Sequence, residues 1–131
     1  MLPRLALAHL ELGQAPRAQE IATEAVRRAH AGAYHLALVD ALRAQGLIAQ
    51  RQERWDEARR VLNMGLRMAR DMCYPYAEAR LLYAYGEMYA QQRAPQEARE
   101  QLTAALVILR RLGAHYDAER VAQIIASITI Q

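Results

Sequence analysis

The residues that could do chemistry are few and scattered in this chain of 131 residues. Its histidines never stand three or four positions apart, the spacing that places two imidazoles on one helix face to bind a metal; they are His9, His30, His35 and His115. Ser127 is the only serine and no glycine-flanked turn surrounds it, while Cys73 has no nameable orienting group for a catalytic thiol. We therefore expect no catalytic residue, no metal, no cofactor and no enzymatic activity.

The charge of the chain is carried by arginine, because the sequence contains no lysine and has a formal net charge of +3. Without lysine, this chain can form neither a Walker A phosphate loop nor a Schiff base. Carboxylates share the arginine-bearing segments, so no strongly basic face indicates direct nucleic-acid binding. One cysteine excludes an intramolecular disulfide, and neither a signal peptide nor an apolar run of roughly 20 residues is present. We expect a cytoplasmic protein that does not enter a membrane.

The elements that would position a site repeat along the chain. Small residues recur at a spacing of 40, in one series as Ala18, Ala58 and Ala98 and in another as Ala6, Gly46, Gly86 and Ala126. Apolar residues three and four positions apart predict helices near 34–51 and 74–92, with partner helices near 55–72 and 95–112. Short turn-forming segments separate these helices, so consecutive helices must reverse direction.

The segment Leu82-x2-Tyr85-Gly86-x2-Tyr89, followed by Ala98-x3-Leu102, resembles the tetratricopeptide repeat. Weaker copies begin at Leu42 and Leu2. The period of 40 exceeds the usual period of about 34 and is similar to that of C-terminal repeat tails in bacterial regulatory ATPases and transcription regulators. The resemblance implies an all-α, right-handed solenoid of antiparallel helix hairpins with about seven helices. We expect a single domain, 1–131, with repeat units 1–33, 34–73 and 74–113 and a terminal helix, 114–131.

A binding surface follows from this arrangement, because the first helices of such hairpins line the concave side of the stack. Stepping along their apolar stripes predicts a groove of Asp40, Arg43, Leu47, Gln50, Arg51, Arg80, Tyr83, Glu87, Gln91, Arg120 and Gln123. The arginine bias favours an acidic peptide or protein, since guanidinium groups bind carboxylates bidentately. Among the seven tyrosines, only Tyr83 is expected to face the groove, and most of the others are interpreted as packing residues. The alternative is that these positions form a merely solvated helix face.

The C-terminal apolar residues Ile124, Ile128 and Ile130 point toward the place that a following helix would occupy. We expect a homodimer, or contact with a partner, through this end. The predicted function is a non-enzymatic scaffold that binds a peptide or protein on the groove or on the end face. The alternative is a regulatory segment of a larger ATPase or transcription regulator that senses a ligand or a neighbouring domain. A deep pocket with converging polar groups would favour sensing, and an open surface would favour protein binding.

Overall fold

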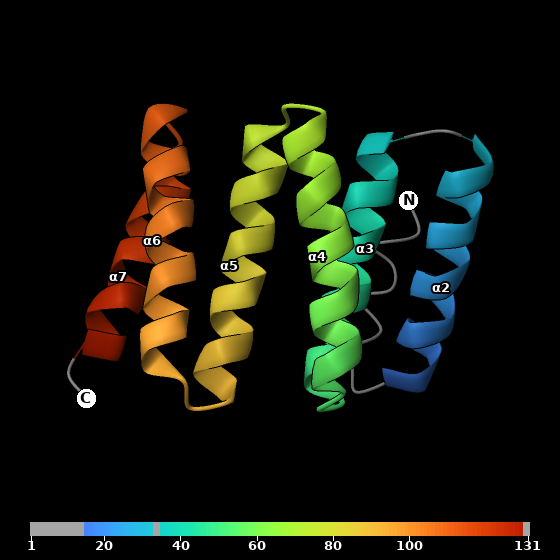
Figure 1. The fold of residues 1–131 in the computed structure, drawn as a ribbon, viewed down its shortest axis with the longest axis horizontal. Helices are drawn as coiled ribbons and strands as arrows, with labels where there is room; N and C mark the ends of the chain where they lie inside the picture. Colours follow the sequence, from blue (N-terminus) through green and yellow to red (C-terminus); the bar gives the residue numbers. More distant parts are fainter. Residues whose placement is uncertain (1–14, 33–34, 130–131) are drawn as a thin grey trace. The chain divides into compact units, whose positions relative to one another are not determined.

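The structure is a computed structural model that describes residues 15–32 and 35–129. Within these ranges the chain is all-α, with helices α2 (Ala15–Gly32), α3 (His35–Arg51), α4 (Trp55–Asp71), α5 (Pro75–Gln91), α6 (Pro95–Arg111) and α7 (His115–Thr129) (Figure 1). Within each compact part of the chain, consecutive helices run in opposite directions, which confirms the predicted fold class of helix hairpins. None of the described helices is long and apolar enough to cross a membrane. The repeat copy that begins at Leu2 lies outside the described residues.

The chain divides into two compact units, residues 1–72 and residues 73–131. In the first unit α2 packs on α3 and α3 packs on α4, and in the second unit α5 packs on α6 and α6 packs on α7. Within each unit, each helix thus contacts its neighbour in sequence. The boundary between the units falls within one residue of the predicted boundary between the repeats 34–73 and 74–113. The single domain over 1–131 stays a prediction.

The turns between the helices from α3 onward share one length, since α4, α5, α6 and α7 begin 20 residues apart. At the end of α3 the Arg54 N–H donates to the Ala49 carbonyl at 2.9 Å and the Glu53 N–H donates to the Gln50 carbonyl at 3.0 Å. The same pair of bonds closes α5 and α6. These bonds form the Schellman motif, which satisfies carbonyl groups left open at a helix end. Two such helix-and-turn steps account for the sequence period of 40.

Each of these turns holds one residue in the left-handed region of φ and ψ. The residues and their φ values are Glu53 (56°), Cys73 (55°), Arg93 (59°) and Gly113 (71°). A residue with a Cβ is strained in this region and glycine is not. The turn at Gly113 therefore avoids a backbone cost that the other three turns carry.

The core of each hairpin is organised by a glycine that faces a leucine of the partner helix. A Cβ built on Gly46 would lie 2.6 Å from Leu62 Cδ2, and one built on Gly86 would lie 2.5 Å from Leu102 Cγ. Both leucines are fully buried. Real Cβ atoms are not found at such distances, so only glycine fits these crossings. The recurrence of this contact 40 residues apart confirms the register predicted from the small residues.

We expect Gly86→Leu to lower the free energy of unfolding by about 1–3 kcal/mol or more, because the added side chain must displace the buried Leu102. Ala90→Leu is the matched control, since Ala90 is exposed on the same helix, and it should change stability by less than about 0.5 kcal/mol. Urea unfolding followed by circular dichroism measures both. Equal stability of the two variants would contradict the assigned crossing.

The turns give a second prediction, about the strain of the left-handed residue. Gly113→Ala should destabilise by about 1 kcal/mol. Since nothing lies within 4 Å of a Cβ at this position, the cost is that of the backbone alone. Arg93→Gly should shift stability in the opposite direction, by less, because glycine also raises the entropy of the unfolded chain. Thermal unfolding of the pair checks the sign, and a stabilising Gly113→Ala would exclude the strain.

Candidate functional site

The predicted groove residues fall in both units, so the structure describes them as two separate sets. Helix α3 of the first unit carries Asp40, Arg43, Leu47, Gln50 and Arg51. In the second unit the residues on α5 and α7 are Arg80, Tyr83, Glu87, Gln91, Arg120 and Gln123. All but Gln50 are at least partly accessible.

Two of the charges in the set on α3 pair with each other. Arg43 Nη2 lies 3.3 Å from Asp40 Oδ1, and the Arg43 side chain is only 14% exposed. The two charges therefore neutralise each other on their own helix. The prediction that Gln50 faces a partner is wrong, because its side chain is 2% exposed. The projection assumed one apolar stripe, whereas consecutive residues from Ile48 to Gln50 are all buried and α3 is covered on more than one side.

The set on α5 and α7 is built on two Tyr-x3-Arg pairs that lie 40 residues apart. The Arg80 guanidinium carbon lies 5.9 Å from the centre of the Tyr76 ring, and Arg120 lies 5.9 Å from the centre of the Tyr116 ring. Residues four positions apart are neighbours on a helix surface, so each guanidinium can cover a ring of its own helix. The rings remain accessible, with Tyr76 45% exposed and Tyr116 75% exposed.

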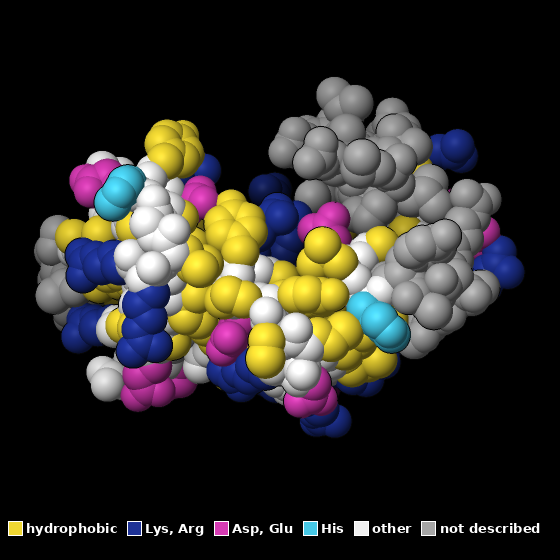
Figure 2. All heavy atoms as spheres, turned by 90° about the horizontal axis from the view of Figure 1, so that it is seen from above, with side chains coloured by type: hydrophobic (Ala, Val, Ile, Leu, Met, Phe, Trp, Pro, Cys, Tyr) yellow, Lys and Arg dark blue, Asp and Glu magenta, His cyan; other side chains and the backbone are white. Residues whose placement is uncertain are grey.

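Helices α5 and α7 both pack on α6 and are also joined by their own side chains. The Tyr76 hydroxyl donates a hydrogen bond of 2.7 Å to Asp117 Oδ2. The Arg120 guanidinium also acts on the Tyr83 side chain, whose pKa it lowers by its charge and by hydrogen bonding. These contacts bring side chains of α5 and α7 together on one surface, which we name the tyrosine–arginine face. It consists of Tyr76, Arg80, Tyr83, Glu87, Tyr116, Asp117 and Arg120. Figure 2 looks down on the end of the helices at which α5 and α7 begin, where hydrophobic and basic side chains are exposed together.

The half-buried Tyr83 has a pKa raised above its ordinary value of 10.0. Burial is the largest cause, because it disfavours the phenolate, and the negative charge of Glu87 adds to it. The charge and the hydrogen bond of Arg120 lower this pKa without cancelling the rise. Tyr83 is therefore a neutral phenol near pH 7, and the positive charge of Arg120 beside it is not neutralised by this tyrosine.

Arg120 differs from the arginines that are paired on their own helices. Its guanidinium is exposed, and in the described part of the chain no carboxylate forms an ion pair with it. By contrast, several arginines form an ion pair with a carboxylate three residues away, namely Arg27, Arg43, Arg54, Arg59 and Arg60. Arg120 is held instead by the Tyr116 ring and the Tyr83 hydroxyl. A guanidinium has five N–H donors, so most of the donors of Arg120 stay available to a ligand.

Reasoning from the sequence did not single out Tyr76 and Tyr116, since it interpreted most tyrosines other than Tyr83 as packing residues. That interpretation is confirmed for Tyr85, which is 5% exposed and stacks on Tyr89 with ring centres 5.9 Å apart. It is wrong for Tyr76 and Tyr116, whose rings are exposed at the beginnings of α5 and α7. The signal that could have found them is the Tyr-x3-Arg spacing, which recurs with the period of the chain.

The predicted end face lies on α7 of the second unit. Ile124 and Ile128 are half-buried there, and Ile130 lies outside the described residues. Self-association through this end stays a prediction. Elsewhere in the described ranges, no group of three or more His, Cys, Asp or Glu side chains could hold a metal ion.

Comparison with known proteins adds no relative to this description, since no protein-family model matches the chain and no curated protein matches it. The tetratricopeptide resemblance therefore stays a prediction that rests on the repeated residues themselves. The geometry of the tyrosine–arginine face is the basis on which a function can be argued.

The raised pKa of Tyr83 predicts a loss of stability at alkaline pH. The folded chain holds the phenol proton of Tyr83 more tightly than the unfolded chain does. The contribution of this proton to the free energy of unfolding is therefore fully present below pH 10, and it is lost as the pH rises through the raised pKa. Tyr83→Phe has no such proton, so its free energy of unfolding should fall less over this range. Urea unfolding at pH values on both sides of 10 measures the difference. Equal losses in the two proteins would refute it.

Proposed function

We propose that this chain is a non-enzymatic protein–protein interaction module that binds a peptide or protein partner on the tyrosine–arginine face. The observation that carries the proposal is the 75% exposure of Tyr116 beside an arginine that stacks on its ring. Tyrosine and arginine are enriched among the few residues that dominate binding energy at protein interfaces. Burying one tyrosine ring in a complex would contribute about 2–4 kcal/mol before the cost of association.

The contacts within this face support the proposal because they restrict its side chains before any partner arrives. Tyr76 is fixed by its hydrogen bond to Asp117, and Tyr116 is covered on one side of its ring by Arg120. A side chain that is already ordered loses less conformational entropy when it binds. Each ring thus presents a rigid contact area of the kind that protein-binding surfaces use.

The charges around the rings favour a protein over a nucleic acid. Asp117 and Glu119 lie on α7 beside the Tyr116 ring, and Glu87 lies close to Tyr83. A polyphosphate backbone requires several basic groups without interleaved carboxylates. A peptide, whose charges are sparse and of both signs, is the better match to such a mixed surface.

The test is a selection from a random peptide library on the purified chain, followed by mapping of the enriched peptides with NMR chemical shifts. We expect the shifts to concentrate on α5 and α7 of the second unit. Tyr116→Ala should weaken binding about tenfold or more, since truncation of a hot-spot residue costs about 2 kcal/mol. Because Tyr116 is so exposed, this change should alter stability by less than about 0.5 kcal/mol.

The matched control is Val107→Ala on α6, which removes an apolar side chain that is 44% exposed but lies outside the tyrosine–arginine face. This variant should bind the selected peptides as the unaltered chain does. Peptides that shift α6 residues instead, or that bind Tyr116→Ala and the unaltered chain equally, would place the binding surface elsewhere. A selection that enriches no peptide would contradict the function itself.

A further inference from the structure

We infer that the tyrosine–arginine face selects peptides by a carboxylate, which Arg120 holds, with an apolar side chain beside it, which the Tyr116 ring contacts. This inference rests on the proposed function and adds the chemistry of the partner. It begins from Arg120, which is exposed and has no ion-paired carboxylate in the described part of the chain. The shared chemistry is the carboxylate, whether an Asp or Glu side chain or a peptide C-terminus supplies it.

The placement of Arg120 is what makes it a recognition group. Its guanidinium carbon lies 5.9 Å from the Tyr116 ring centre, and it also interacts with the Tyr83 side chain of α5. Both contacts leave the guanidinium its charge, because the Tyr116 ring contacts it as a cation–π partner and Tyr83 keeps its proton near pH 7. A carboxylate that met Arg120 would therefore find a charged fork of donors that no described carboxylate already occupies as an ion pair.

Two carboxylates of the tyrosine–arginine face interact with tyrosines. Asp117 accepts the hydroxyl of Tyr76, and Glu87 acts on Tyr83. The equivalent position in the first unit shows the opposite arrangement, since Asp40 stands where the second unit has Arg80 and it pairs with Arg43 on the same helix. Charge complementarity to an external carboxylate is thus a property of α7 and its Tyr83 contact, not of every repeat.

The apolar half of the ligand follows from the ring beside the arginine. Tyr116 is covered by Arg120 on one side and is otherwise 75% exposed, so an apolar side chain can pack on the remaining ring surface. Desolvation by that side chain would strengthen the adjacent ion pair, because charges attract more strongly where water is excluded. A peptide with both features side by side would gain more than one with either alone.

The probes are peptides of about ten residues on a Gly/Ser background, with blocked ends, that carry one Leu next to one Glu. A second set replaces Glu by Gln, and a third set carries the Leu at a free C-terminus with no acidic side chain. Titration calorimetry in low salt should show the Glu set binding about tenfold or more tighter than the Gln set, the range expected for a charge-assisted hydrogen bond. The third set tells whether a main-chain carboxylate serves equally. The preference should shrink as salt is added.

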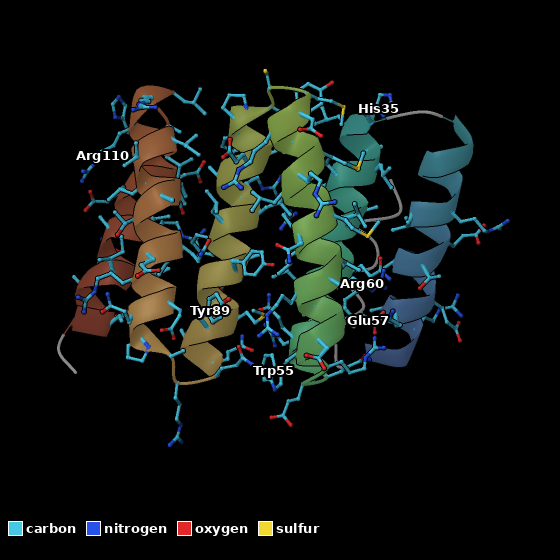
Figure 3. The ribbon with its side chains drawn as sticks, in the orientation of Figure 1. His35, Trp55, Glu57, Arg60, Tyr89 and Arg110 are labelled. Carbon is cyan, nitrogen blue, oxygen red and sulfur yellow. The ribbon has the colours of Figure 1, made fainter. Side chains whose placement is uncertain are left out.

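Variants assign the preference to Arg120. With Arg120→Gln the Glu and Gln peptides should bind within about twofold of each other. Arg110→Gln is the charge-matched control, because Arg110 is exposed on α6 and points away from α5, and it should keep the full preference (Figure 3). Tyr83→Phe keeps the charge of Arg120 but removes the hydroxyl that positions it. We expect an intermediate preference from that variant, with unchanged helix content in all of them by circular dichroism.

The outcomes separate this inference from the function on which it rests. If library-selected peptides map to α5 and α7 but the Glu and Gln probes bind alike, the face binds proteins and the carboxylate chemistry is overturned. The carboxylate chemistry is also overturned if the preference for Glu over Gln peptides survives Arg120→Gln. It is overturned as well if Arg110→Gln removes that preference to the same extent as Arg120→Gln. If no peptide maps to this face at all, the proposed function fails first.

Discussion

At two helix crossings the space between a glycine backbone and the facing leucine side chain admits a hydrogen atom and nothing larger. Gly46 meets Leu62 there, and Gly86 meets Leu102, so the two helices of each hairpin approach until the leucine side chain fills the crossing. This close approach lets the first helix of the hairpin be buried on several sides, as the run of buried residues along α3 and α5 shows. The positions left accessible on those helices are few, and they are the ones that can carry a function.

The two units use the same framework for different surface chemistry. In the first unit Arg43 and Asp40 form an ion pair on α3, so these two charges neutralise each other. In the second unit the arginines contact tyrosine rings, and Arg120 also interacts with the Tyr83 side chain. These partners do not neutralise the charge of Arg120. Aromatic partners hold a guanidinium in place without cancelling its charge, which an aspartate cannot do. Equivalent positions in a repeat can therefore differ in function although their backbones do not.

The sequence predicted the helices to within about two residues, because breakers, small residues and apolar spacing all recur with one period. It also placed Arg80, Tyr83 and Arg120 on accessible faces of α5 and α7. It failed at Gln50, since a single-stripe projection cannot tell how many sides of a helix are covered. It failed at Tyr76 and Tyr116 because tyrosine suits both a core and an interface, and only tertiary contacts decide between them. The hydrogen bond of Tyr76 to Asp117 is such a contact and has no local signature.

That hydrogen bond spans 41 residues, whereas every major helix contact in the two units joins neighbours along the chain. Neighbour contacts form quickly, because closing a short turn costs little entropy, and a hairpin such as α5–α6 can form as soon as its second helix has been synthesised. The tyrosine–arginine face cannot form at that stage, since Asp117 and Arg120 belong to α7. A nascent chain therefore passes through a stage in which its hairpins are folded but this surface is still incomplete. The proposed binding surface is completed only when the last described helix docks.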